Sequence, residues 1–449
     1  MINKKILYSI LIVFLILSPK IVLCDLRPPQ IIFDWATVKY NSAGERQWLA
    51  RKDGVKGKPG NIAADQLENL YVISDCSAII KYDPNGNEIW NVVPHNGCYP
   101  DPDFGYLDNS YIIIDKLDYI ILFNNSFVMS EDFHFVAKYD LNGALVWKVD
   151  DILFNLDNMV LDSYNNMIFT GYEDDKYSIC AKYGSEGDQI WVKKFSQNEI
   201  PSINDVALDS HDNIYTTGNG FFTKYDQNGK VLWADQSVGM GVYIIPDYND
   251  NIFLIEYSSQ AYQIIKYNIN GGKTRTKNIN IQLISGFKLD SKGNLIIIER
   301  NNNAITTYKY DHEIDLIWER QYEFAYLAYD ENYTISLAIS NSDNIIIATT
   351  FDSEYLVIQY DPEGKELWAN RNDNTNYMKS VTVDSSGSVY VTGYYEKNPI
   401  SGKHIKKNDQ GSSDGCGCSM NSIAHDGSIF VLMMAIGLIA LMYGKINRR

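Results

Sequence analysis

The chain has 449 residues, of which 45% are hydrophobic, and carries a formal net charge of −17 with a pI near 4.8. This hydrophobic content is enough to fill a core. The acidic balance argues against a nucleic-acid partner, because phosphate binding needs clustered Lys and Arg side chains. A chain of this length is ordinarily divided into two or three domains unless it is built from repeats.

The N-terminal segment predicts export. Residues 1–5 carry two lysines and precede the apolar run 6–17, which is the order found in a signal peptide. We assign residues 1–24 to this signal. Cleavage after Cys24 is favoured over lipidation of Cys24, because the preceding Leu23 is larger than a lipoprotein signal prefers.

A ten-residue pattern recurs along the chain. Residues 81–90 read Lys-Tyr-Asp-Pro-Asn-Gly-Asn-Glu-Ile-Trp, and the intervals between successive copies of the tyrosine are 42 to 44 residues in five of seven cases. A fixed period of this length indicates a repeat architecture. The eight copies end at Trp48, Trp90, Trp147, Trp191, Trp233, Arg275, Trp318 and Trp368.

Each copy predicts a β-hairpin, with a second hairpin before it. Short strands of β-branched and aromatic residues flank the turn at Asp83, where Pro84 presets φ and Gly86 takes a positive φ without a Cβ clash. The second hairpin has Asp and Asn four residues apart, as at Asp209 and Asn213. Two hairpins make four antiparallel strands, which is one propeller blade.

The order of the hairpins predicts a closed ring. The hairpin in residues 36–49 has no partner before it and the one in residues 380–394 has none after it, so the two complete one blade. We therefore predict an all-β, eight-bladed propeller over residues 32–395, with four antiparallel strands per blade. Seven blades is the alternative, because the hairpin near residues 112–123 departs from the pattern.

The repeat resembles the Asp/Gly/Trp propeller repeats of bacterial exported proteins, including the NHL-like and quinoprotein-like propellers. The resemblance implies the fold and leaves the function open, because propellers serve many tasks. It also implies that Arg275 marks a weaker seam between blades. Trp35 lies outside the pattern, and we expect it to contribute less to stability. By the resemblance, contacts between blades are made by Trp48, Trp90, Trp147, Trp191, Trp233, Trp318 and Trp368.

The sequence shows no pattern typical of an active site or a metal site. It contains no Gly-x-Ser-x-Gly or His-Glu-x-x-His motif, no adjacent cysteine pair, and only six histidines. The turn at Asp83 lacks the spacing of an EF-hand loop. We expect no catalytic residues, no cofactor and no metal ion. The alternative is an exported enzyme, such as a lyase or a quinoprotein-like dehydrogenase.

Length variation gathers on one predicted face. Antiparallel order puts tight turns on one side of the ring and the insertions 95–109, 124–134 and 319–336 on the other. Aromatic residues on variable loops favour recognition. Cys76 and Cys98 are expected on this variable face, where export permits a disulfide between them, and Cys180 is expected in the core. The candidate binding residues are Tyr99, Asp101, Asp103, Phe104, Tyr322, Phe324, Tyr326 and Tyr329.

The C-terminal segment predicts an anchor. Residues 396–427 form a polar linker that contains Cys416 and Cys418, and residues 428–449 combine an apolar run with a basic end. This order resembles the Cys-containing sorting signals of myxobacteria and related groups. The resemblance implies processing near Cys416 or Cys418 and display at the cell surface. A plain single-span anchor is the alternative.

These features together predict a monomeric propeller held outside the cytoplasm by its C-terminal helix. We expect it to bind a protein or glycan ligand, without catalysis and without nucleic acid.

Overall fold

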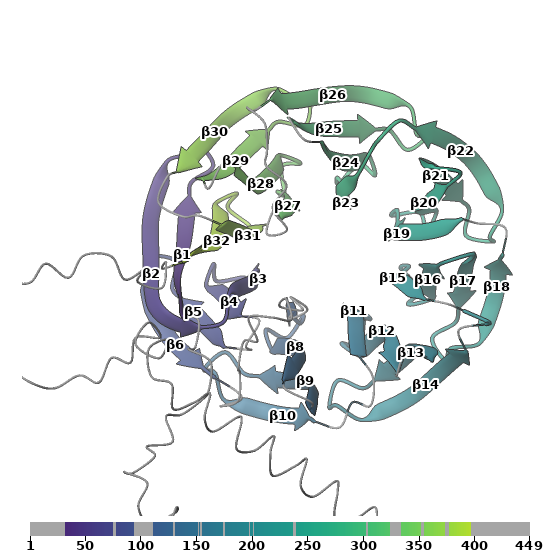
Figure 1. Ribbon diagram of the computed structural model, residues 1–449, viewed down its shortest axis with the longest axis horizontal. Coiled ribbons are helices and arrows are strands. Elements are labelled where there is room, and N and C mark those ends of the chain that lie inside the picture. The colour runs from purple at the N-terminus through teal and green to yellow at the C-terminus, as the bar shows by residue number, and fades with distance from the viewer. Residues whose placement is uncertain are drawn as a thin grey trace, which may run out of the picture. The chain divides into compact units, whose positions relative to one another are not determined.

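The computed structural model describes residues 32–396, apart from 75–77, 94–110, 129–130, 151, 153–154, 174–175, 197, 201, 237–238, 302–303, 324–333, 352–353 and 373–376. In this part the chain forms eight four-stranded antiparallel sheets, which stand as blades around a central channel (Figure 1). The predicted eight-bladed propeller is confirmed, and the seven-bladed alternative is wrong. The irregular hairpin near residues 112–123 forms an ordinary pair of blade strands.

Each blade has strands A to D from the channel outward. The A strands are β3 (Pro59–Ala64), β7 (Tyr111–Ile114), β11 (Asn155–Leu161), β15 (Ile203–Leu208), β19 (Met240–Pro246), β23 (Ile284–Leu289), β27 (Ile335–Ile339) and β31 (Tyr377–Val383). The B strands are β4 (Leu70–Ser74), β8 (Ile120–Val128), β12 (Met167–Glu173), β16 (Ile214–Gly218), β20 (Ile252–Ser258), β24 (Leu295–Arg300), β28 (Ile345–Phe351) and β32 (Val389–Glu396).

The two outer strands complete each sheet. The C strands are β1 (Ile32–Tyr40), β5 (Ile79–Tyr82), β9 (Glu131–Tyr139), β13 (Tyr177–Tyr183), β17 (Phe221–Tyr225), β21 (Ala261–Tyr267), β25 (Ala304–Tyr310) and β29 (Glu354–Tyr360). The D strands are β2 (Arg46–Lys56), β6 (Glu88–Val92), β10 (Leu145–Val149), β14 (Gln189–Ser196), β18 (Val231–Asp235), β22 (Lys273–Ile279), β26 (Leu316–Glu323) and β30 (Glu366–Asn372). We number the blades from 1 (β3–β6) to 7 (β27–β30).

Blade 8 closes the ring from both ends of the described chain. Its sheet has the order β2-β1-β32-β31, and β1 pairs with β32 from Phe33–Glu396 to Tyr40–Val389. Two C-terminal strands and two N-terminal strands therefore share one blade, as the hairpin order predicts. This pairing removes two open sheet edges.

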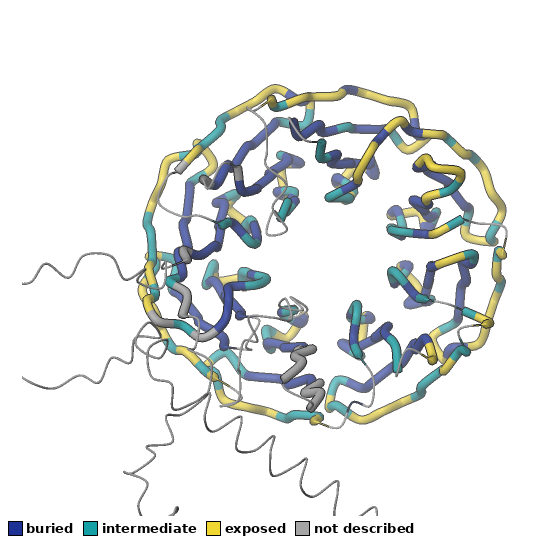
Figure 2. The backbone as a smooth tube through the Cα atoms, viewed as in Figure 1, coloured by how far each residue is buried: buried dark blue, intermediate teal, exposed yellow. Residues whose placement is uncertain are grey.

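The core consists of eight apolar clusters, one in each seam between neighbouring blades. Alternate residues of a strand point to opposite faces. In β4, Leu70 and Val72 pack toward blade 8, whereas Tyr71 and Ile73 pack toward blade 2. The first residues of the B strands are therefore buried on both faces, and Figure 2 shows the middle of each blade buried and the perimeter exposed.

Two expectations from the sequence need correction. Residues 124–134 are not a loop insertion, because β8 and β9 continue through them as a long hairpin. Trp35 is 1% exposed, packs in the seam between blades 8 and 1, and donates its indole N–H to the Gly57 carbonyl at 2.9 Å. Its position outside the repeat therefore did not mean a smaller structural role.

Several predictions fall outside the described residues. These are the signal peptide 1–24 with Cys24, the linker after residue 396 with Cys416 and Cys418, the apolar segment 428–449, and the proposed pair Cys76 and Cys98. In the described part of the chain, no helix has the length and apolar character needed to cross a membrane.

Candidate functional site

One face of the propeller, which we call the tight-turn face, carries sixteen five-residue turns that join strand A to B and C to D in every blade. The two turn types share one geometry. The A–B turn that begins at Asp65 and the C–D turn that begins at Asp83 are examples. In each, the Oδ1 of the first residue accepts hydrogen bonds from the backbone N–H groups of the third and fifth residues. The fourth residue has a positive φ in each, at Glu68 and Gly86.

The first residue of most A–B turns is a buried carboxylate. Asp209 accepts hydrogen bonds from Asn213 Nδ2 at 2.9 Å and Tyr215 Oη at 3.1 Å, and lies 3.0 Å from Lys224 Nζ on strand C. Burial raises the pKa of Asp209, but the bonds from Asn213 and Lys224 outweigh it and hold this pKa below its ordinary value. Similar ion pairs are Lys39–Asp384, Lys138–Asp115, Lys182–Asp162 and Lys309–Asp290.

Blade 7 lacks both charges at once. Ser340 stands at the position of the carboxylate and Gln359 at the position of the lysine, and both are buried. The carboxylate and the lysine are expected to be replaced together, because one buried charge without its partner would keep its desolvation cost and strongly destabilise the fold. The pair is therefore a structural unit that lies beneath the turn.

Adjacent A–B turns are linked around the channel mouth. Ser210 donates its N–H and Oγ–H to the two carboxylate oxygens of Asp250 in the next blade, at 2.8 and 2.7 Å. Ser163 binds Asp212, and Ser291 binds Asp343, in the same way. These acceptors occupy the fourth turn position at φ 58° to 61°, a conformation that non-glycine residues rarely adopt. The hydrogen bonds that these aspartates accept from the neighbouring blade offset the free-energy cost of the positive φ.

Seven of the eight C–D turns carry glycine at the fourth position, for a different reason. A Cβ on Gly86 would lie 2.6 Å from the Trp48 ring of the preceding blade, so only glycine fits. The Trp48 indole N–H then donates to the Pro84 carbonyl at 2.9 Å. The equivalent indole bonds are made by Trp90, Trp147, Trp191, Trp318 and Trp368. Trp233 packs on Gly271 without that bond being formed.

The seam that lacks a tryptophan is built from other residues. Where the fourth turn position faces Arg275 of the preceding blade, Ile314 replaces glycine and is fully buried in the seam cluster. Arg275 binds Asp315 at 2.6 Å, and Lys277 Nζ donates to the Ile314 carbonyl at 2.7 Å. The isoleucine therefore fills the space left by the missing ring, a compensation that the resemblance did not imply.

Four large apolar side chains stand out from the A–B turns. Leu67, Leu117 and Tyr164 occupy the third turn position in blades 1, 2 and 3, and Tyr248 the second position in blade 5. They are 68%, 68%, 72% and 68% exposed. Exposed aromatic and aliphatic groups on rigid backbone are suited to protein recognition.

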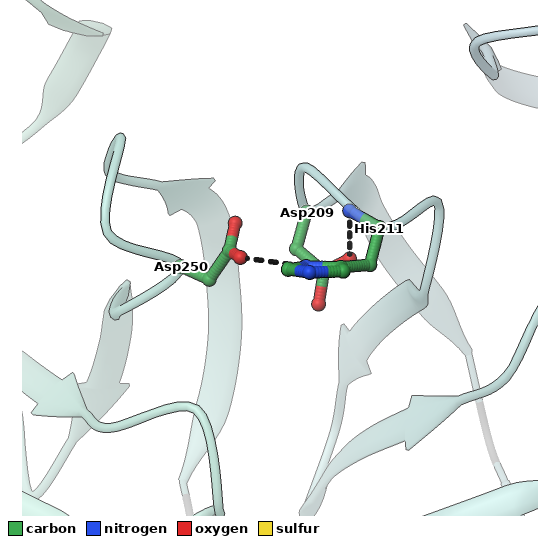
Figure 3. Close-up of side chains that lie close together, drawn as sticks. All are labelled: Asp209, His211 and Asp250. Carbon is green, nitrogen blue, oxygen red and sulfur yellow. Dashed lines mark hydrogen bonds and ion pairs between the residues drawn. The ribbon is translucent and has the colours of Figure 1, made fainter.

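Blade 4 presents His211 at the third position, between these groups. His211 Nδ1 lies 2.9 Å from Asp250 Oδ2, and ligand atoms of Asp209, His211 and Asp250 lie within 4.8 Å of one another (Figure 3). Every carboxylate oxygen here already accepts a hydrogen bond or contacts Lys224. We therefore assign these residues to the link between blades 4 and 5.

The channel holds ionisable groups on its inner strands. Burial raises the pKa of Asp157 to about 6 and that of Asp205 to about 7, the latter although two backbone N–H groups bind it. Burial lowers the pKa of Lys288, which lines a cavity of about 410 Å³ with Tyr111. Among the histidines whose side chains the structure describes, His211 and His312 lie in turns of the tight-turn face. Neither of these two joins the channel carboxyls in an acid–base pair.

The structure describes one of the eight candidate binding residues. Tyr322 lies in strand β26, not in a loop, and its hydroxyl accepts a bond from Arg371 of the next blade at 3.2 Å. Cys180 is fully buried, and burial raises its thiol pKa to about 12. The candidates outside the described residues are Tyr99, Asp101, Asp103, Phe104, Phe324, Tyr326 and Tyr329.

Sequence reasoning did not select Leu67, Leu117, Tyr164, His211 or Tyr248. The available signal was the Asp and Asn spacing of the A–B hairpin, which marks the turn and hence the residues that it exposes.

Comparison with known proteins supports the fold. The chain is 24% identical over 426 residues to the uncharacterized WD repeat-containing protein L264 of Acanthamoeba polyphaga mimivirus, covering 79% of this chain and 28% of that protein. It is similar to the C-terminal WD40 domain of Sif2, with 9% identity, 75% of this chain and 96% of the domain covered, and a TM-score of 0.55. This chain is a propeller repeat protein.

A second solved structure agrees with this. The Dos1 propeller is 10% identical, with 81% of this chain and 95% of that chain covered and a TM-score of 0.52. At such identities the likeness shows the fold alone. The chain spans about a quarter of the length of its mimivirus relative. No protein-family model matches the sequence.

Proposed function

We propose that this chain is a non-catalytic scaffold that binds a protein through its tight-turn face while it is held outside the cytoplasm. The observation that carries the proposal is the set Leu67, Leu117, Tyr164 and Tyr248, each more than two-thirds exposed on a turn that is fixed by internal hydrogen bonds. WD-repeat propellers, to which the chain is similar, are consistent with a protein partner.

Rigid presentation favours affinity. Binding costs free energy when side chains and loops become ordered, and these turns are already ordered by their internal hydrogen bonds and by the contacts between blades. The sequence segments 1–24 and 428–449 support the location outside the cytoplasm. A second contact with the partner protein, through Tyr322 and the loops of the opposite face, remains a prediction.

A photo-crosslinking amino acid placed at Tyr164 tests the proposal in cells that make the protein. We expect Tyr164 to yield a defined crosslinked product with another protein, because the side chain points away from the ring. The matched control is Ile190, which is 48% exposed on the outer strand β14. Crosslinks of equal yield from both positions, or none from positions 67, 117, 164 and 248, would contradict the proposal.

A further inference from the structure

We infer that the tight-turn face binds a basic protein segment that also carries apolar side chains. The inference rests on the proposed function and adds the chemistry of the partner. Two independent properties of the face support it: the identity of the residues at one turn position and the charge of all sixteen turns.

The third turn position shows that the apolar groups are not required by the fold. The same turn geometry occurs sixteen times, yet a large apolar side chain stands at the third position only in Leu67, Leu117 and Tyr164. The other thirteen turns have a polar, charged or small residue there, such as Asn85, or Lys292 in blade 6. Because turn chemistry does not select these three residues, and consecutive blades carry them, they form a patch suited to a partner.

The charge of the face is strongly negative. The sixteen turns contain twenty-three Asp and Glu residues against four Lys residues, and the seven lysines of the C strands offset part of the excess. Twenty-three minus these eleven leaves a net charge of −12, out of −17 for the whole chain. Complementary charge steers association and suppresses partners of like charge, so this face selects a basic partner.

The two properties coincide in space. Glu68 and Asp118 follow Leu67 and Leu117 directly in their turns and stay partly exposed. A segment whose leucine or aromatic side chains contact Leu67, Leu117 and Tyr164 therefore places its Lys or Arg groups beside carboxylates. An acidic or purely polar segment lacks one or both contacts.

Synthetic peptides on an array test the inference, with the full-length protein solubilised in mild detergent as the probe. We expect the bound peptides to combine net positive charge with Leu, Ile, Phe or Tyr, and binding to fall about tenfold between low and moderate salt because exposed charges are screened. The triple variant Leu67→Ser, Leu117→Ser and Tyr164→Ser should bind these peptides about tenfold more weakly or worse.

The matched control replaces three apolar residues of similar kind on the perimeter. Ile89→Ser, Ile190→Ser and Leu367→Ser change side chains that are 51%, 48% and 44% exposed on outer strands, and should leave peptide binding unchanged. Both triple variants should melt near the wild-type temperature. The charge variant Glu68→Gln with Asp118→Asn should reduce the salt dependence of binding.

Selection of neutral or acidic peptides, or wild-type binding by the turn-face variant, overturns the inference. In that case a crosslinked protein partner at Tyr164 leaves the proposed function standing. Absence of both peptide binding and crosslinks overturns the proposed function as well.

Discussion

The buried pair Asp209–Lys224 allows a direct test of how the tight turns are supported. The side chain of Asp209 is fully buried and that of Lys224 is 4% exposed, at an Nζ–Oδ2 distance of 3.0 Å. Lys224→Gln leaves the carboxylate buried with four hydrogen bonds, from His211, Asn213 and Tyr215. Asp209→Ser leaves a buried ammonium that keeps a hydrogen bond to the Ile269 carbonyl at 3.3 Å and a cation–π contact with the Tyr215 ring.

Blade 7 supplies the natural double replacement, Ser340 with Gln359. Removing one member of a buried ion pair costs about 3–5 kcal/mol. We expect a loss of about 3 kcal/mol for Lys224→Gln, because the remaining carboxylate keeps four hydrogen bonds. The loss for Asp209→Ser should be somewhat larger, because the remaining ammonium keeps only one hydrogen bond. The double variant should cost less than the sum of the two single losses by about 1–3 kcal/mol, because no buried charge is left without its partner.

Urea unfolding followed by tryptophan fluorescence measures all four proteins of this cycle. The reasoning is refuted if the two single losses add to the double loss within about 0.5 kcal/mol, the margin seen for independent sites. The matched control replaces an acidic residue by Ser and a lysine by Gln at two exposed positions of a C–D turn, Glu363→Ser and Lys365→Gln, where little change is expected.

Four further measurements follow from the structure. Trp35→Ala should cost about 3–5 kcal/mol in urea unfolding, at least as much as Trp147→Ala, because the Trp35 ring is more deeply buried; a smaller loss at Trp35 would count against its role in closure. Arg275→Trp should lower the melting temperature, because the new ring would clash with Ile314. Adding Ile314→Gly should restore the melting temperature, because the other tryptophans pack on a glycine at this position. A double variant less stable than the single one would contradict this account of the seam. The pKa of Asp157 is raised to about 6, above an unfolded value of about 3.9, so the folded state binds the extra proton and stability falls as pH rises between these values. Because the pKa of Asp205 is also raised, to about 7, that residue contributes to the same fall in stability. Melting temperatures from pH 3 to 8 should therefore fall less steeply in Asp157→Asn than in the wild type, and an unchanged slope would refute the contribution of Asp157. Removal of residues 397–449 should leave a ring with an unchanged melting temperature, because blade 8 ends at Glu396, and should release it from membranes; mass spectrometry of the full-length C-terminus then separates processing near Cys416 or Cys418 from a span that ends at Arg449.

Local chemistry made much of the fold predictable. Asp83 and Gly86 specify a turn through contacts within five residues, and the regular return of the tyrosine counts the copies. Ring closure followed from the two half-blades at the ends of the repeat. The hairpin near residues 112–123 departs from the repeat pattern, but its two strands pair as in the other blades and keep the apolar residues of a blade.

The candidate site was less accessible to sequence reasoning. Aromatic residues in long insertions drew attention to the variable loops, whereas Leu67, Leu117 and Tyr164 lie in short turns that resemble all the others. Their significance depends on which neighbouring blades present them together. That arrangement is set by the order of blades around the ring.

By itself the sequence determined the turn geometry and the strand pattern, and it favoured eight blades with closure by the N-terminal hairpin, because these depend on contacts within a hairpin and on a count of hairpins. Only the tertiary structure decided that Trp35 is buried, that Ile314 replaces a missing tryptophan, and that Ser210 and Asp250 join two blades. These contacts join residues of different blades, and their existence depends on which face of each strand meets the neighbouring sheet. The register between sheets decides that, and no local pattern encodes it.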